Sequence, residues 1–72
     1  MNITKQDLEI FEKIKESHSA DDWAESVDIW GNAGFFYRPE WRLHRLYDLG
    51  LMERKLEKLR GYYDWKFRIK VK

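Results

Sequence analysis

The segment that decides the fold is residues 43–55, with the sequence LHRLYDLGLMERK. In its first half, Leu43, Leu46 and Tyr47 share one face of a helical wheel, which predicts the inward face of a helix. Gly50 then stands where helices commonly end. The residues after this glycine can pair as a strand with the last part of the chain, so the segment predicts a helix joined by a tight turn to a β-hairpin.

The last segment of the chain carries a strong strand signal. From Tyr63 onward, aromatic and β-branched residues occupy every second position, and mostly basic residues fill the positions between them. This alternation over nine residues is typical of a strand with one buried face. Residues 51–56 are its predicted partner strand, with a loop over 57–61. The predicted inward residues are Tyr63, Trp65, Phe67, Ile69 and Val71.

A first helix is predicted near the start of the chain. Thr4 and Asp7 have the spacing of a capping box, with Asp in place of the usual Glu, and the helix extends to about Ser17. Its apolar residues Leu8, Phe11 and Ile14 recur at helical spacing. The predicted core contact is between Leu8, Phe11 and Leu46 on the helices and Trp65, Phe67 and Ile69 on the last strand.

Two more helices are predicted before the hairpin. Ser19 has the character of an N-cap, and the acids after it suit the first turn of a helix. The inward face of this second helix is predicted to be Trp23, Val27 and Trp30, and its end is either near Val27 or at Gly31. Pro39 suits the first position of a third helix, which continues to Leu49.

The junction at residues 43–55 resembles that of winged-helix regulators of the MarR, ArsR and PadR type. In these proteins a recognition helix ends in a glycine, and an apolar pair and a charged strand then begin the wing. Arg60-Gly61-Tyr62-Tyr63 resembles the returning limb of the wing, so the resemblance covers about residues 38–71. It implies an α+β fold, a three-helix winged helix-turn-helix with a C-terminal two-stranded wing. The length of 72 residues predicts a single domain over residues 1–72. One departure is the segment 28–38, which is longer and more aromatic than the usual turn.

The charge of the chain is divided between its two parts. Residues 1–30 hold three lysines against eight acids, a net charge of −5, and residues 31–72 hold eleven basic residues against five acids, a net charge of +6. This asymmetry has two interpretations. A basic face meets an anionic partner, or the acidic and basic parts attract each other within one fold.

The family resemblance implies binding of double-stranded DNA, with the third helix in the major groove and the wing beside the backbone. The chain would then be a transcriptional regulator or a phage-type accessory factor. Arginine reads guanine and binds phosphate, which favours the arginines of the third helix as contacts. The candidate DNA-binding residues are Arg38, Trp41, Arg42, His44 and Arg45 on or beside the helix, and Lys58 and Arg60 at the wing tip.

Trp41 supports an alternative function. It lies opposite Leu43 on the helical wheel, on a face that also holds Asp48, an acid that repels phosphate. An outward Trp beside Phe35-Phe36-Tyr37 has the composition of a protein interface, with a second copy or another protein as partner. The other interpretation is that Trp41 folds back over these aromatic residues. We expect it to be exposed.

Aromatic rings among basic residues also suit stacking on single-stranded bases, and the sequence does not separate this from duplex binding. Catalytic and metal-binding functions find little support in the sequence. Two histidines without cysteine make no recognisable metal site, and no catalytic motif or phosphate-binding glycine loop is present, so we expect no enzyme activity and no cofactor. The absence of cysteine suits a reducing compartment. The N-terminus has no signal-peptide pattern, and the longest uncharged run, residues 29–37, is far too short to span a membrane. These features predict a cytoplasmic protein.

Overall fold

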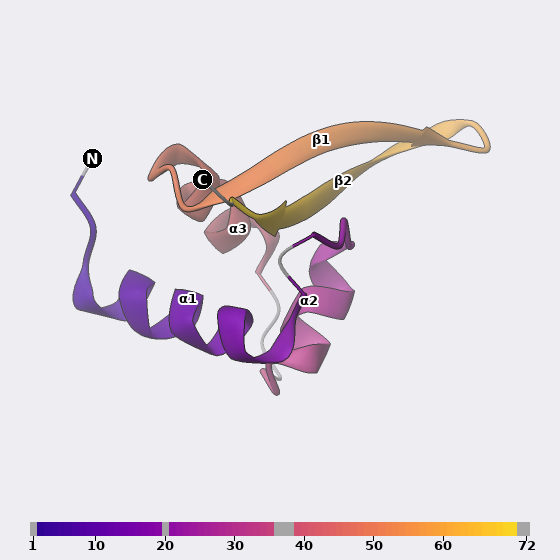
Figure 1. Cartoon of the computed structure of the whole chain (residues 1–72). Helices are drawn as coiled ribbons and strands as arrows, with labels where there is room; N and C mark the ends of the chain where they lie inside the picture. The colour runs from indigo at the N-terminus through magenta and orange to yellow at the C-terminus, as the bar shows by residue number, and fades with distance from the viewer. Residues whose placement is uncertain (1, 20, 36–38, 71–72) are drawn as a thin grey trace.

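The computed structural model describes residues 2–19, 21–35 and 39–70. In this part of the chain, three helices precede one antiparallel hairpin, as the sequence predicts. The helices pack together beneath the inner part of the hairpin, whose turn projects beyond all of them (Figure 1). The α+β winged-helix layout is therefore confirmed. The elements are α1 (Lys5–Ser17), α2 (Ser26–Asn32), α3 (Glu40–Asp48), β1 (Met52–Leu59) and β2 (Tyr62–Ile69).

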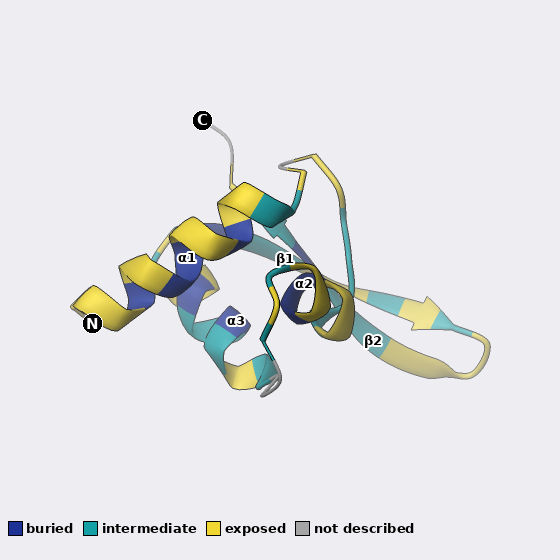
Figure 2. Cartoon of the chain, turned by 90° about the horizontal axis from the view of Figure 1, so that it is seen from below, coloured by how far each residue is buried: buried dark blue, intermediate teal, exposed yellow. Residues whose placement is uncertain are grey.

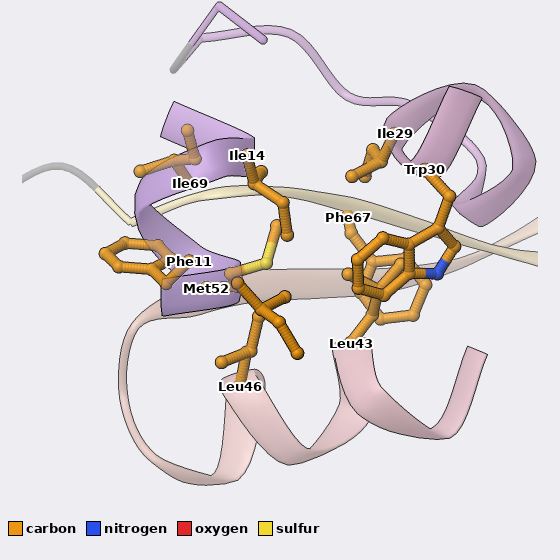
Figure 3. Close-up of a cluster of buried hydrophobic side chains, with 10 residues drawn as sticks. Phe11, Ile14, Ile29, Trp30, Leu43, Leu46, Met52, Phe67 and Ile69 are labelled. Atoms are coloured by element: carbon orange, nitrogen blue, oxygen red, sulfur yellow. The ribbon is translucent and has the colours of Figure 1, made fainter. Parts of the chain in front are cut away.

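The core lies between the three helices and the inner end of the hairpin (Figure 3). Phe67 and Ile69 are buried in it, as predicted, whereas Trp65 is half-buried and Tyr63 is exposed. Over the described residues, the predicted inward stripe of β2 is thus covered only at its inner end, because the hairpin extends past the helices. Val71, which is also predicted to face inward, lies outside the described residues. The buried hydrophobic residues are Ile10, Phe11, Ile14, Ile29, Trp30, Leu43, Leu46, Met52, Phe67 and Ile69.

The inward face of α1 differs from the prediction. The Thr4–Asp7 capping box is present, and Phe11 and Ile14 are buried, but Leu8 is exposed. The buried stripe begins instead at Asp7, whose carboxylate is turned inward. Because neighbouring residues on a helix are 100° apart, a buried stripe that includes Asp7 leaves Leu8 on the solvent side. Figure 2 shows that α1 is buried along one side and exposed along the other.

Helix α2 begins at Ser26, so the predicted start near Ser19 is wrong. The cause is a backbone bridge: the N–H of Ala24 donates to the carbonyl of Phe67 at 3.0 Å, and the N–H of Phe67 donates back at 2.9 Å. This bridge holds residue 24 in an extended conformation beside β2, so no helix passes through it. Val27 is consequently exposed, and the helix ends at Asn32, close to the predicted end at Gly31 and past the alternative end at Val27.

Helix α3 follows the prediction closely. Pro39 is its N-cap and Leu49 its C-cap. Gly50 has φ +80°, and its N–H donates to the carbonyl of Tyr47 while the N–H of Leu51 donates to that of Leu46. This is a Schellman motif, which needs a left-handed residue and therefore favours glycine. Leu46 is buried as expected, but Tyr47 is exposed.

The hairpin is longer than predicted and its turn is shorter. Strand pairing continues to Leu59 and Tyr62, so the loop consists of Arg60 and Gly61 rather than residues 57–61. Both loop residues have positive φ, +34° and +92°. Two positive φ values are the signature of a type I′ turn, whose twist matches that of the strands.

Candidate nucleic-acid interface

The two faces of the hairpin differ in charge. Successive side chains of a strand point to opposite faces, and directly paired residues share a face. All three acidic residues of the hairpin lie on one face, and the face that continues into the core has none. The aromatic face comprises Met52, Arg54, Leu56, Lys58, Tyr63, Trp65, Phe67 and Ile69, and the mixed-charge face comprises Glu53, Lys55, Glu57, Leu59, Tyr62, Asp64, Lys66 and Arg68.

The cations of the mixed-charge face are neutralised. Each lies within ion-pair distance of a carboxylate, and Trp23 adds its ring beneath Lys55 and Arg68, at 4.7 and 4.5 Å. The hydrogen bond from Lys66 to Glu25 raises the pKa of this lysine. Each of the three bases on this face therefore has a carboxylate partner, two of them on the face itself and one, Glu25, in the segment before α2. The ion pairs are Lys55–Glu57 at 3.5 Å, Lys66–Glu25 at 3.2 Å and Arg68–Glu53 at 3.0 Å.

On the aromatic face, Arg54 connects the hairpin to α3. Its guanidinium lies 4.0 Å from the ring centre of Tyr47 and 4.8 Å from that of Trp65, between two aromatic side chains. One of its nitrogens, Nη1, lies 2.7 Å from Nδ1 of His44. Among the residues that the structure describes, Arg54 has no carboxylate partner. The guanidinium is therefore held in place by groups other than carboxylates, and its positive charge remains available to an anion.

His44, a predicted DNA contact, is half-buried in this same junction. Its ring packs edge-on against Trp65 and Phe67, both with centres 5.0 Å away. Because a guanidinium only donates hydrogen bonds, Nδ1 accepts from Arg54 and the ring proton lies on Nε2, which donates to Glu40 at 3.2 Å. His44 thus positions Arg54. The sequence did not indicate this hydrogen bond between α3 and the hairpin.

Lys58 and Arg60, the predicted contacts at the wing tip, lie on the part of the hairpin that projects from the body. Within the described ranges neither has a carboxylate partner. Lys58 lies 6.0 Å from the ring centre of Tyr63, the residue paired with it. Arg60 occupies a left-handed conformation that side chains other than glycine and asparagine rarely adopt, and such positions cluster at functional sites.

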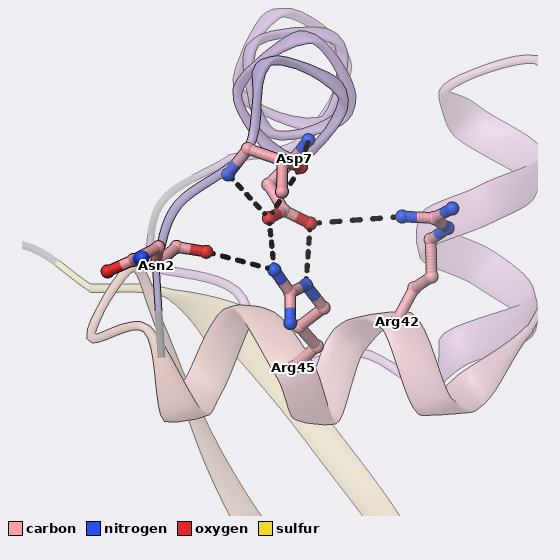
Figure 4. Close-up of polar contacts among 5 residues, drawn as sticks. Asn2, Asp7, Arg42 and Arg45 are labelled. Atoms are coloured by element: carbon pink, nitrogen blue, oxygen red, sulfur yellow. Dashed lines mark hydrogen bonds and ion pairs between the residues drawn. The ribbon is translucent and has the colours of Figure 1, made fainter.

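The arginines of α3 have a different environment (Figure 4). Nε and Nη2 of Arg45 donate to the two carboxylate oxygens of Asp7 at 2.9 and 2.7 Å, and Nη1 of Arg42 lies 3.8 Å from the same carboxylate. Asp7 is 2% exposed, and the hydrogen bond from Arg45, opposed by desolvation, holds the pKa of its carboxyl well below the usual range. Arg45 also donates to the carbonyl of Asn2. Both arginines therefore join α3 to the start of α1, and their contact with DNA stays a prediction.

Trp41 is exposed, as we expected, with 54% of its surface accessible. The guanidinium of Arg42 lies 4.6 Å from its ring centre. A shallow apolar hollow of about 190 Å³ adjoins it, lined mainly by Ile10, Trp30, Phe35 and Pro39. The other predicted contact beside this helix, Arg38, lies outside the described residues, as do Phe36 and Tyr37.

The sequence contains the signal for the residues that the prediction missed. Arg54 lies within the junction at residues 43–55 and has the same parity in β1 as Lys58. Once the two-residue turn at Arg60 and Gly61 is known, the register pairs Lys58 with Tyr63 and Leu56 with Trp65. An assumed loop of five residues concealed this register, and with it the separation of charge between the two faces.

Comparisons with known proteins support the fold. The chain matches no protein-family model and no curated protein sequence. Its structure is similar to that of a protein described as a possible transcriptional regulator from Methanosarcina mazei Go1, with a TM-score of 0.69 at 18% sequence identity. The similarity covers 99% of this chain but 59% of that protein. At this identity the likeness establishes a shared fold.

Two structural findings bear on other classes of function. Over the described residues, no three His, Cys, Asp or Glu side chains are grouped so that they could hold a metal ion. No helix in that part of the chain has the length and apolar character needed to cross a membrane.

Proposed function

We propose that the chain binds double-stranded DNA and acts as a regulatory DNA-binding protein, with the aromatic face and the turn of the hairpin as the main contact surface. The observation that carries the proposal is the separation of charge between the two faces. Three ion pairs neutralise the mixed-charge face, whereas Arg54 and Lys58 on the aromatic face have no carboxylate partner in the described chain.

Cations without a carboxylate partner favour binding to a polyanion such as DNA. A lysine or arginine that neutralises a phosphate releases condensed counterions, and this release drives much of the affinity for duplex DNA. A cation already held by a carboxylate loses that partner on binding and contributes less. Lys58 and Arg60 are therefore the strongest candidates for phosphate contacts, and Arg54 adds charge where the hairpin meets α3.

The winged-helix fold is consistent with this surface. Such domains place a helix in the major groove and a wing beside the backbone. Here the exposed side of α3 carries Trp41 and Asp48, and Arg42 and Arg45 are turned towards Asp7. We therefore assign more of the binding energy to the hairpin than to α3. The similarity to a possible transcriptional regulator agrees with a regulatory role.

The test compares two lysines of the same strand that lie on opposite faces. Binding to a fluorescent random-sequence duplex of about 20 base pairs is measured by anisotropy at about 50 and 150 mM salt. We expect Lys58→Gln to lower the affinity at low salt about fivefold and to reduce the salt slope by about one. Lys55→Gln removes the same charge, but Glu57 already neutralises it, so its effect should be smaller. Absence of binding at low salt, or equal effects of the two variants, would overturn the proposal.

A second candidate function is protein binding through Trp41. The observation that favours it is an exposed indole next to an apolar hollow, with the acid Asp48 exposed on the same helix. Aromatic anchors that enter apolar depressions carry much of the energy of protein interfaces. A second copy of the chain is the simplest partner to test. Concentration-dependent association in sedimentation equilibrium that Trp41→Ala abolishes would support this function, and a monomer at all concentrations would count against a homodimer.

A further inference from the structure

Exposed aromatic rings gather on the projecting part of the hairpin. Tyr63 is 63% exposed and Tyr62 is 58% exposed, and Leu56 is also exposed. Strand pairing sets Tyr63 opposite Lys58 and Trp65 opposite Leu56, so these four residues form one continuous patch on the aromatic face. A short chain needs its large rings in the core, so rings left in solvent on a projecting hairpin call for a functional explanation.

Phosphate contacts alone do not explain these rings. In a duplex the flat faces of the bases are covered by their neighbours, and a protein reaches only base edges and the backbone. Unpaired bases, in contrast, offer their faces to aromatic side chains, and a groove with nearby cations tracks their phosphates. Tyr63 and Trp65 are two residues apart on one face, about 7 Å along the strand. The patch thus combines stacking surfaces with the unpaired cations Lys58 and Arg60.

We propose that the aromatic face of the hairpin stacks on unpaired DNA bases, so that the chain binds a duplex with a single-stranded branch more tightly than a blunt duplex. This inference rests on the proposed function, because Lys58 and Arg60 hold the backbone in both. Tyr63 is the outermost stacking residue. Trp65 lies farther in, where its ring also packs against His44 and faces Arg54.

The two neighbouring tyrosines provide a matched experiment. Tyr62 pairs with Leu59 on the mixed-charge face and Tyr63 pairs with Lys58 on the aromatic face, while their exposure is similar. Three probes with the same number of nucleotides are compared by anisotropy: a blunt duplex, a fork with oligothymidine arms, and oligothymidine alone. We expect the wild-type chain to prefer the fork over the blunt duplex about tenfold. Tyr63→Leu should remove most of this preference, whereas Tyr62→Leu should keep it.

Each outcome decides between the proposals. Equal affinity for fork and blunt duplex, or equal effects of the two leucine variants, overturns stacking. If the blunt duplex still binds and Lys58→Gln weakens it, the proposed function stands without the further inference. Failure to bind any of the three probes overturns both. Since both tyrosines are exposed, neither variant should unfold the chain, and circular dichroism spectra that match the wild type verify this.

Discussion

The junction between α1 and α3 and the outer part of the hairpin use the same residue types for different purposes. At the junction, Arg45 and Arg42 converge on a carboxylate that is almost fully buried. On the outer hairpin, Lys58 and Arg60 project into solvent. The difference lies in the carboxylate partner rather than in the cation. At the junction, an acid from another helix faces arginines that the helical wheel predicts as DNA contacts, so these arginines also hold two helices together.

The largest effect is expected at the junction. Asp7→Asn keeps the size of the side chain but removes the charge that accepts two hydrogen bonds from Arg45. Because bonds to charged groups are among the stronger ones, we expect the free energy of unfolding to fall by about 2 kcal/mol. Urea denaturation measures this loss, with Glu9→Gln as the control on the exposed side of α1. DNA affinity under folding conditions should not fall. A weakened affinity would show that the junction belongs to the binding surface.

The same carboxyl gives the junction a signature in acid. The pKa of Asp7 is lowered in the folded chain, whereas the pKa of an Asp in an unfolded chain is about 3.9. A lowered pKa contributes stability that is fully present above the unfolded value and is lost as the pH falls towards the folded one. The stability difference between wild type and Asp7→Asn should therefore stay constant near neutrality and shrink below about pH 4. A difference independent of pH down to about pH 2 would argue against the ion pair.

The two regions also show which features the sequence could predict and which it could not. Periodicity predicted the order of elements and the burial of Phe67, Ile69 and Leu46, because helix and strand spacings are local properties. It failed at Ser19, where a backbone bridge from Ala24 to β2 overrode a good capping signal. It also could not indicate the ion pair of Arg45, since its partner Asp7 lies 38 residues away. The spacing of residue types along the chain does not indicate contacts between segments that are distant in sequence.

A substitution at Trp41 tests whether the exposed side of α3 belongs to the junction or to a binding surface. More than half of its surface is in solvent, and the guanidinium of Arg42 packs against its ring. Little buried area would be lost on truncation, so Trp41→Ala should lower the free energy of unfolding by less than about 1 kcal/mol. A melting curve checks this. A loss of about 3–5 kcal/mol, as for a buried Trp, would instead show that the indole closes the apolar hollow.

The smallest effect on stability, and the only gain, is expected at the turn. Arg60 has φ +34° in a two-residue turn whose first position is normally Asn, Asp or Gly. Asparagine tolerates this conformation better, so Arg60→Asn should raise the free energy of unfolding by about 0.5 kcal/mol. If Arg60 contacts phosphate, the same change should weaken duplex binding and lower the salt slope by about one. Arg60→Lys keeps the charge in the strained position and serves as the control, with binding retained and no gain in stability. A stabilised Asn variant that binds DNA as tightly as the wild type would remove the turn from the binding surface, because the strain at residue 60 would then accompany no contact.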